Sequence, residues 1–429
     1  MKSVKLQLLV TLAAAAVAAG IFIHRGPLPH RDVWGAASHR DFPDLGRHWR
    51  WGVDLEHRVG GSTALWAAAQ CGDRDVVEWL VAHGAEINAT DDNGRSVLFG
   101  AVLDRHKDIA EFLIAHGADV TAKDGKGHTI LPYAAYSGWK RICDLCIAAG
   151  NDVLDADSGH SLLHAAAFHG WTDLVELTVG RGADVNARTE DGVTPLHMAA
   201  DGGSRDTAAL LIARGADVNA GTKGGVTPLH MAAEGNAPGT AELLIDRGAD
   251  VNARDKVRKP TSGRARGGRT PLHYAVGRDG RVAAEVARLL VAKGADVNAR
   301  DASGSTPLHH AAEYRMLEAI RLLLDLGALV DVPDNHGSSA LHRAVGSQNP
   351  GAAETVALLI AAGANVNAKT LWGRTPLHMA KDGKTAAMLL DAGANVNARD
   401  TEGRTPLHWA SGLRRVEVAE LLRRHGAKE

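Results

Sequence analysis

The sequence has little of what most metal-binding, disulfide-bonded or nucleic-acid-binding chains depend on. Three cysteines in 429 residues cannot form a disulfide framework or a four-thiolate metal site. The 48 basic and 50 acidic side chains give a formal net charge of −2, which excludes a nucleic-acid-coating polycation and a strongly acidic tail protein. Aromatic residues are only 4% of the chain, whereas 48 residues are glycine. This composition favours closely packed helices joined by many short loops.

Motifs of common active sites are also absent. The chain contains neither Gly-x-Ser-x-Gly nor His-Glu-x-x-His, and Gly383-Lys384-Thr385 lacks the earlier glycine of a phosphate loop. We therefore predict no catalytic residue, no cofactor and no metal site, and we expect the protein not to be an enzyme.

The first 23 residues differ from the rest. Lys2 and Lys5 precede an apolar run over residues 6–23 that has only two polar side chains. A basic start followed by an apolar run is typical of an export signal. Uncleaved, the run would be about 27 Å long, so a membrane anchor is the alternative. We expect residues 1–23 to be a signal peptide or an anchor, and the protein to be exported: periplasmic, secreted or held in the inner membrane.

A repeat accounts for most of the remaining sequence. Six copies of Thr-Pro-Leu-His are present, at positions 194–197, 227–230, 270–273, 306–309, 375–378 and 405–408. Degenerate copies begin at Thr63, Ser96, Thr129, Ser161 and Ser339. The most frequent spacing between copies is 33 residues, and Gly-Ala-Asp-Val-Asn-Ala recurs in the same phase, with Asn for Asp in two copies. About eleven copies of one structural unit are predicted.

Each part of the unit has a physical function. Thr or Ser can cap a helix, and the following Pro fits the first helical turn. Leu and a pair of alanines make a thin first helix, a Leu-rich second helix follows, and a glycine such as Gly215 ends it in the left-handed conformation. A unit of about 33 residues cannot bury its apolar face alone, so it is stabilised by stacking on its neighbours.

On these motifs the sequence resembles the ankyrin repeat family over about residues 52–427. The resemblance implies an all-α repeat solenoid with short β-hairpin fingers, in a curved, elongated stack. It also implies protein binding on the concave side, which the first helices and finger tips form. The sequence departs most in repeats one to three, where Trp66, Phe99 and Pro132 replace the motif histidine. Repeats one to four and repeat nine lack the motif proline.

The chain therefore divides into three predicted parts. Residues 1–23 are the export signal or anchor, residues 24–51 are a linker or N-terminal cap, and residues 52–429 are the ankyrin repeat domain. The middle part contains three prolines and three tryptophans, and we expect it to cover the end of the stack.

Histidine is frequent, with 22 copies. The motif position is occupied by His164, His197, His230, His273, His309, His342, His378 and His408. A catalytic role would need one site rather than eight equivalent ones. We predict a structural ladder in which each imidazole hydrogen-bonds the helix-start Thr or Ser and an adjoining loop.

Cys143 and Cys146 form a Cys-x-x-Cys in the second helix of repeat three, where other repeats have Val or Leu. Buried core thiols are the main prediction. A disulfide or redox pair, which export would favour, and a metal site, which lacks further ligands, are the alternatives.

The hairpin of repeat seven is ten residues longer than the modal period. The insertion, residues 256–269, has no acidic residue and carries Lys256, Arg258, Lys259, Arg264, Arg266 and Arg269. It is either a solvated loop without function or a basic contact for an acidic protein, a lipid headgroup or nucleic acid. The near-neutral chain and the expected export argue against nucleic acid.

The residue after each motif histidine is expected to face the concave side. Repeats five to seven place Met198, Met231 and Tyr274 there, an apolar stripe beside the basic insertion. Partial burial against neighbouring hairpins is the alternative. The predicted partner-binding residues are Met198, Met231, Tyr274, His310, Lys256, Arg258, Lys259, Arg264 and Arg266.

We therefore predict a non-catalytic, exported ankyrin scaffold, a monomer that binds one or more proteins and no nucleic acid. The Ala-, Gly- and Arg-rich sequence is typical of a bacterial protein. The alternatives are a membrane-attached adaptor, held through residues 6–23 and the basic hairpin, and the targeting arm of an enzyme activity not visible in the sequence. Residues 24–51 are too short to supply a catalytic domain.

Overall fold

The computed structural model describes residues 36–37, 54–154, 156–157, 160–256, 267–277, 282–346 and 352–428. They belong to two compact units: unit 1 ends at Leu162, and unit 2 runs from Leu163 to Glu429. The predicted export segment, residues 1–23, and all of the predicted cap except residues 36–37 lie outside the described residues. Within the described ranges, no helix has both the length and the apolar character needed to cross a bilayer.

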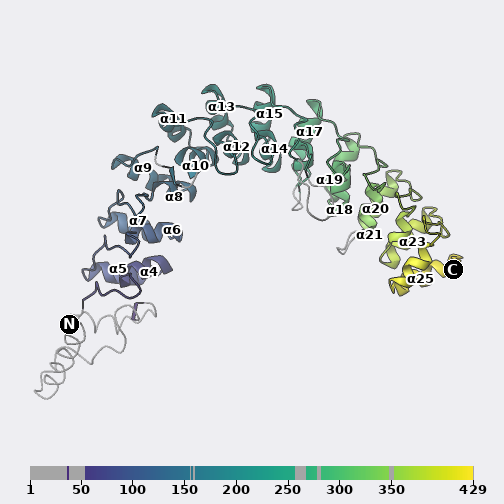
Figure 1. Ribbon diagram of the computed structural model, residues 1–429, viewed down its shortest axis with the longest axis horizontal. Helices are drawn as coiled ribbons and strands as arrows, with labels where there is room; N and C mark the ends of the chain where they lie inside the picture. Colours follow the sequence, from purple (N-terminus) through teal and green to yellow (C-terminus); the bar gives the residue numbers. More distant parts are fainter. Residues whose placement is uncertain are drawn as a thin grey trace, which may run out of the picture. The chain divides into compact units, whose positions relative to one another are not determined.

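Unit 1 contains three helical hairpins, one for each of the first three repeats (Figure 1). They are α4 (Ala64–Cys71) with α5 (Arg74–Ala82), α6 (Val97–Leu103) with α7 (Lys107–Ala115), and α8 (Leu131–Tyr136) with α9 (Lys140–Ala148). The first helices pack in sequence, α4 on α6 and α6 on α8, and α5 packs on α7. Two short strands follow, β1 (Ala156–Asp157) and β2 (His160–Ser161), which pair antiparallel.

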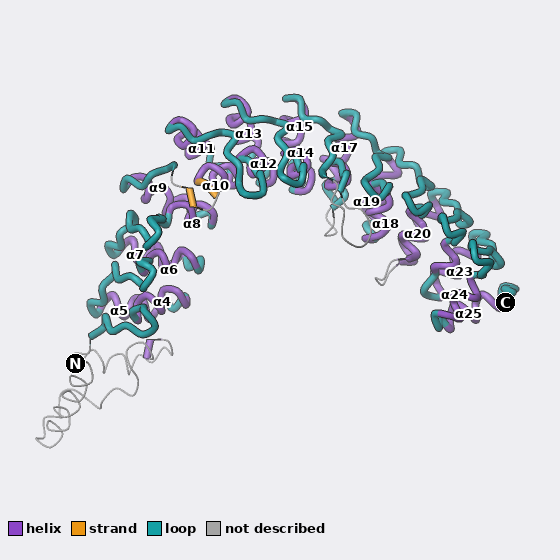
Figure 2. Tube along the Cα trace, in the orientation of Figure 1, coloured by secondary structure: helices purple, strands orange, loops and turns teal. Residues whose placement is uncertain are grey.

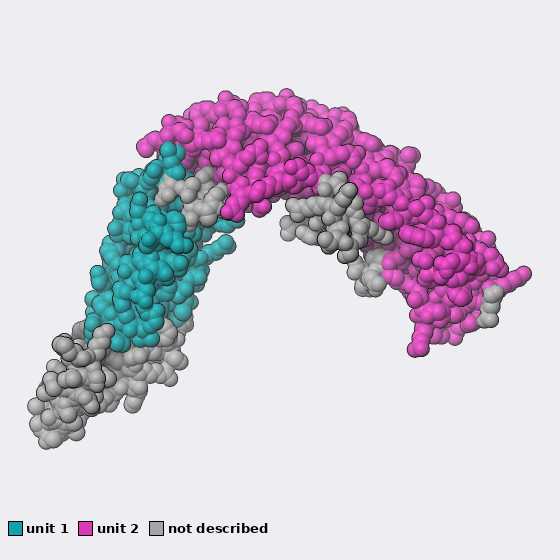
Figure 3. Space-filling view, in the orientation of Figure 1, with its two compact units in different colours: residues 1–162 teal, residues 163–429 magenta. Residues whose placement is uncertain are grey.

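The described part of unit 2, shown in magenta in Figure 3, contains eight further hairpins, one for each of repeats four to eleven (Figure 1). They are α10 (Leu162–His169) with α11 (Thr172–Gly180), α12 (Pro195–Asp201) with α13 (Arg205–Ala213), α14 (Pro228–Glu234) with α15 (Pro238–Asp246), α16 (Pro271–Ala275) with α17 (Ala284–Ala292), α18 (Pro307–Tyr314) with α19 (Leu317–Asp325), α20 (Ala340–Gly346) with α21 (Ala352–Ala361), α22 (Pro376–Met379) with α23 (Gly383–Asp391), and α24 (Pro406–Gly412) with α25 (Val416–Arg424). The first helices from α12 to α24 pack in one row, and the second helices pack on one another from α11 to α17 and from α19 to α25. The predicted all-α repeat solenoid is confirmed.

The sequence explains where the first helices begin. In repeat eleven, Thr405 has an extended backbone and its Oγ1 accepts a hydrogen bond from the N–H of His408 at 3.3 Å. Repeat three lacks this cap. Its proline is the second residue of the helix, so α8 begins after Ile130, and the hydroxyl of Thr129 is buried without a hydrogen-bond partner. The departure that the sequence shows in repeat three therefore changes how its helix begins.

Glycine ends the second helices as predicted. In repeat five, Gly215 has a φ of +93°, a conformation that a side chain would strain. Its N–H donates to the carbonyl oxygen of Ile212, and the N–H of Ala216 donates to that of Leu211, each at 3.0 Å. These bonds satisfy carbonyl groups that the end of the helix leaves without a partner.

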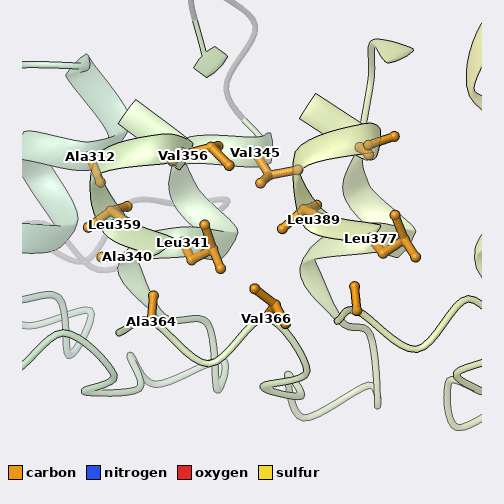
Figure 4. Close-up of a cluster of buried hydrophobic side chains, with 14 of the residues drawn as sticks. Ala312, Ala340, Leu341, Val345, Val356, Leu359, Ala364, Val366, Leu377 and Leu389 are labelled. Carbon is orange, nitrogen blue, oxygen red and sulfur yellow. The ribbon is translucent and has the colours of Figure 1, made fainter. Parts of the chain in front are cut away.

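The core of unit 2 is a column of aliphatic and small side chains (Figure 4). One leucine from each second helix of repeats five to eleven has no exposed surface: Leu211, Leu244, Leu290, Leu323, Leu359, Leu389 and Leu422. Leu341 and Leu377 of neighbouring first helices lie in the same cluster. Alanine pairs such as Ala311 and Ala312, both fully buried, let the first helices approach closely. Each repeat therefore completes the core of its neighbour.

The finger that precedes each first helix is mostly a tight turn (Figure 2). In repeat eight it spans residues 301–305: the N–H of Asp301 donates to the carbonyl oxygen of Ser305, and the N–H of Gly304 donates back to that of Asp301, both at 2.9 Å. Among the described residues, paired strands occur only as β1 and β2, with isolated bridges at Val59–Ser62 and Thr90–Ser96. A five-residue finger is too short for a longer ladder.

Candidate protein-interaction face

Six motif histidines of unit 2 are each held by two repeats. The backbone N–H of Thr194 donates to Nδ1 of His197 at 3.1 Å, and Nε2 of His197 lies 2.9 Å from the carbonyl oxygen of Val226 in the next finger. Because an amide N–H only donates, Nδ1 is the acceptor, the ring proton is on Nε2, and Nε2 donates to Val226. The same two bonds are made by His230, His273, His309, His342 and His378. The predicted ladder is confirmed at these positions.

These imidazoles are neutral. Burial lowers the pKa of His197 and His309 to about 4 and that of His273 to about 3. Both ring nitrogens are already used within the stack, so neither is left for a metal ion or for proton transfer. Among the described residues, no group of three or more His, Cys, Asp or Glu side chains is arranged to hold a metal ion.

In repeats one and two the motif histidine is replaced, and the contact with the next repeat changes. The indole Nε1 of Trp66 donates to the carbonyl oxygen of Arg95 at 3.2 Å. Arg95 is the last residue of its finger, as Val226 is in repeat six. Phe99 has no donor and instead packs its ring on Tyr133, with centroids 5.4 Å apart. Trp66 therefore keeps the hydrogen bond that the motif histidine makes to the next finger, whereas Phe99 replaces that bond with a packing contact.

A second row of contacts joins the residue after the motif histidine to the first residue of its own finger. The four donor–carboxylate pairs are Tyr274 with Asp255 (3.0 Å), His310 with Asp301 (2.8 Å), Arg343 with Asp334 (2.6 Å) and Trp409 with Asp400 (3.0 Å). Where the finger begins with threonine, the helix position is methionine: Thr189 with Met198, Thr222 with Met231 and Thr370 with Met379. In repeats five to eleven, a carboxylate at the base of the finger is thus matched by a donor, and a threonine by methionine.

Three carboxylates of this row, those of Asp301, Asp334 and Asp400, have a pKa below the usual range. Burial alone would raise the pKa of Asp301, but hydrogen bonds from His310 and Ser303 outweigh it and hold this pKa well below its usual range. The pKa of Asp400 is lowered in the same way, because the hydrogen bonds from Trp409 and Arg404 outweigh its burial. These carboxylates therefore serve as hydrogen-bond acceptors within the fold.

The residues predicted to bind a partner differ in how much of each side chain is available. Met198 and Met231 lie on the adjacent helices α12 and α14 and are partly exposed. Tyr274 on α16 packs its ring edge-on to His230, and its hydroxyl is bonded to the finger. His310 on α18 is bonded to its finger as well. The three residues of the predicted stripe thus lie on consecutive first helices that pack on one another, and the two methionines are the part without a polar partner.

The basic insertion enters at the tip of its finger. The N–H of Asp255 donates to the carbonyl oxygen of Arg269 at 3.0 Å, which reproduces the finger base of repeat eight. Of the predicted basic residues, Lys256 is described and its backbone N–H donates to Gly224 at 2.7 Å. Arg258, Lys259, Arg264 and Arg266 lie outside the described residues.

Adjacent fingers of unit 2 are joined by one backbone hydrogen bond each. The donors and acceptors are Lys223 to Asp191, Lys256 to Gly224, Ala302 to Gly267, Asn335 to Ser303, Leu371 to His336, and Thr401 to Trp372. Gly225 shows how close this approach is: its φ is +73°, and a Cβ there would lie 2.8 Å from the N atom of Lys256. The finger tips form a continuous backbone surface.

The asparagine of Gly-Ala-Asp-Val-Asn-Ala is a structural residue to which sequence reasoning assigned no role. Nδ2 of Asn219 donates to the carbonyl oxygen of Gly248 at 2.9 Å, and its Oδ1 accepts from the N–H of Asp250 at 3.0 Å. The same two bonds are made by Asn186, Asn252, Asn367 and Asn397. The recurrence of this asparagine in phase with the repeat could have indicated the role, because one side-chain amide supplies both the donor and the acceptor that join two repeats.

Unit 1 contains a cavity of about 260 Å³, lined by Phe99, Tyr133, Asp124 and His128 among others. The Asp124 carboxylate accepts from the N–H groups of Lys126 and His128, each at 2.9 Å, and Nδ1 of His128 lies 3.3 Å from it. These bonds shape the finger of repeat three, so the carboxylate is not free to act as a general base.

Cys143 and Cys146 are fully buried in α9, which confirms their predicted place in the core. Both thiols are free. Burial raises the pKa of both, that of Cys146 to about 12, so the reactive thiolate is disfavoured at neutral pH.

A family model described as ankyrin repeats matches residues 36–124, 163–255, 283–370 and 341–429. Among solved structures, the human ASB11 ankyrin repeat domain is similar, with 28% identity over 54% of this chain and 98% of that chain and a TM-score of 0.45. The ankyrin repeat domain of Bcl-3, described as a unique member of the IkappaB protein family, is 32% identical over 55% of this chain and 99% of that chain, with a TM-score of 0.44. No curated protein matches the chain.

Proposed function

The chain belongs to the ankyrin repeat family, and from this premise we propose that it is a non-catalytic, exported scaffold that binds a partner protein on its first helices and fingers. Ankyrin repeats are protein–protein interaction modules. The proposed binding face centres on α12, α14 and α16 and includes the basic insertion. The observation that carries this choice is the methionine pair, Met198 and Met231, which lies partly exposed on adjacent helices.

The physical properties of this face suit a partner protein. Thioether side chains are polarisable and adapt to the shape of a partner. The backbone around them is held by the histidine bonds of His197 and His230 and by the joined finger tips, so little conformational entropy is lost on binding. The basic residues of the insertion would add a complementary charge for an acidic rim of the partner.

The binding face is tested by changing the two methionines together. The full chain and a Met198→Ser, Met231→Ser variant are immobilised and exposed to an envelope extract, and the captured protein is identified and its affinity measured. We expect at least a tenfold loss for the variant. A Leu329→Ser, Leu413→Ser variant is the matched control, because those leucines are 62% and 51% exposed and lie elsewhere in unit 2. Equal binding by all three proteins would refute this face.

Export is proposed from the sequence of residues 1–23 and is tested separately. Residues 1–60 are fused to a reporter that is active only outside the cytoplasm, and activity is expected. The N-terminal mass of the mature protein then distinguishes a cleaved signal from an anchor. An inactive reporter contradicts export. Turnover of any substrate by the purified chain would contradict the non-catalytic assignment and favour the alternative of an enzyme's targeting arm.

A further inference from the structure

The finger of repeat ten, residues 370–374, differs from the others of unit 2. Its tip carries Leu371 and Trp372, which are 69% and 47% exposed. The tips of the other described fingers of unit 2 carry polar or small residues, such as Ala302 and Ser303 in repeat eight. The backbone of this tip is nevertheless held on both sides. The N–H of Leu371 donates to the finger of repeat nine, and the carbonyl oxygen of Trp372 accepts a hydrogen bond from the finger of repeat eleven. The two exposed apolar side chains therefore stand on a fixed support.

The tip is continuous with a stack of aromatic rings and guanidinium groups. Trp372 stacks on His336, with centroids 5.5 Å apart and an interplanar angle of 19°. The Arg374 guanidinium lies 5.9 Å from the Trp372 ring and 4.0 Å from the Trp409 ring. The Arg404 guanidinium lies 4.6 Å from the centroid of the Trp409 ring. We call these side chains and Leu371 the tip cluster; it draws on the fingers of repeats nine to eleven.

Arg374 is the cation of this cluster that the protein leaves without a counter-charge. Arg404 is paired with Asp400 at 2.9 Å and with Glu402 at 2.8 Å. Arg374 makes no ion pair with any described carboxylate, and its Nε is buried without a hydrogen-bond partner. The planar guanidinium group can donate two N–H bonds to one carboxylate while its face contacts an aromatic ring.

Resting on the proposed function, we propose that the tip cluster binds an acidic segment of a partner protein in which a bulky apolar residue adjoins a carboxylate. The apolar residue packs on Leu371 and Trp372, and the carboxylate bonds to Arg374. Lys369 and Arg399, both exposed at the same fingers, add positive charge around the contact. The surface thus combines an aromatic anchor with an unpaired cation, the combination that makes a strong contact at a protein interface.

Charge and extent favour a peptide over a nucleic acid. Trp372 offers one exposed ring, and the unpaired cation next to it is a single arginine, whereas nucleic-acid binding needs a basic track that follows many phosphates. The chain as a whole has a net charge of −2. An oligonucleotide therefore serves as a competing probe in the test.

The test uses a random 12-residue peptide library displayed on phage and selected on the full chain. Peptides that bind are synthesised, labelled with fluorescein and measured by fluorescence anisotropy against the wild type, Arg374→Gln, Arg374→Lys and Trp372→Ala. A 12-nucleotide oligothymidine is measured alongside. We expect the selected peptides to combine Asp or Glu with an aliphatic or aromatic residue and to bind Arg374→Gln and Trp372→Ala at least tenfold more weakly. Arg374→Lys should also bind more weakly, because lysine keeps the charge and loses the planar fork.

The controls separate this site from the face proposed above. Arg321→Gln and Leu329→Ser remove an exposed cation and an exposed leucine elsewhere in unit 2 and should bind as the wild type does. Unchanged thermal midpoints show that the variants fold. Selected peptides that lose affinity only in the Met198→Ser, Met231→Ser variant would overturn the tip-cluster site and leave the proposed function standing. Tighter binding of the oligonucleotide would overturn the peptide assignment, and no binding of any peptide would count against both proposals.

Discussion

Nε2 of His230 lies 3.0 Å from the carbonyl oxygen of Arg269, although 39 positions separate the two residues in the sequence. The equivalent atoms of His197 and Val226 are 2.9 Å apart over 29 positions. The ten-residue insertion thus leaves the contact between repeats six and seven intact, because it enters at the tip of the finger while the histidine bonds to the base.

Deletion of residues 257–266 should therefore leave the stack folded. It joins Lys256 to Gly267 and restores a five-residue finger whose backbone bonds at Asp255 and Arg269 are already formed. A shorter loop has a smaller entropic cost of closure. We therefore expect the free energy of unfolding to rise by no more than about 1 kcal/mol. Thermal unfolding followed by circular dichroism checks this. A fall of many degrees in the midpoint would mean that the insertion contributes to packing.

The histidine hydrogen bonds should contribute more to stability in the interior of the stack than at its end. His309→Ala removes the ring that bonds to Thr306 at 3.1 Å and to Ser338 at 2.9 Å and leaves both groups buried. We expect a cost of about 2–4 kcal/mol, from the lost hydrogen bonds and from the cavity. His408→Ala is the matched control, since His408 is exposed in the last repeat, and it should cost less than about 1 kcal/mol. Urea unfolding of the two variants measures the difference, and equal costs would contradict this account of the ladder.

Stability should fall when the ladder histidines become protonated in the unfolded chain. Their pKa is lowered by burial, to about 4 for His197 and His309, from about 6.5 in the unfolded state. The stabilisation is therefore complete above about pH 6.5 and is lost as the pH falls toward 4, by up to about 1.4 kcal/mol per pH unit for each histidine. Urea midpoints at pH 7, 6 and 5 measure the slope. His309→Gln should make the slope shallower, and a flat profile would show that folding does not lower the pKa of these histidines.

The matched pairs of finger and helix residues should be exchangeable as pairs. Arg343→Met leaves the carboxylate of Asp334 buried without its 2.6 Å partner, so we expect a loss of about 2–4 kcal/mol. Adding Asp334→Thr recreates the threonine–methionine pair of Thr370 and Met379 and should recover most of that loss. Chemical denaturation of the two single variants and the double variant completes a double-mutant cycle. Additive losses would mean that the two positions are independent.

The fold was predictable because its determinants act over short distances along the chain. The Thr cap, the following Pro and the left-handed glycine of each repeat all lie within a few residues of the helix that they begin or end. The histidine ladder was predictable for a related reason. One imidazole recurring at each helix start implies one structural role, which the bonds of His197 illustrate.

The candidate sites were predictable only in part. The stripe of Met198, Met231 and Tyr274 followed from counting one residue past each motif histidine, but the bond from Tyr274 to Asp255 did not, because the insertion separates the two by 19 positions. The tip cluster was not predicted at all. Trp372 has no counterpart in the repeating motif, and Trp409 comes from the following repeat.

By itself the sequence determined that this chain is a stack of about eleven helical hairpins with a ladder of structural histidines, since the period, the caps and the small residues all act within a single unit. Only the tertiary structure decided which side chains of different repeats meet and which remain unpaired. The Arg374 guanidinium lies 4.0 Å from the centroid of the Trp409 ring because the stacking register of adjacent fingers sets this contact, and that register arises from packing between repeats.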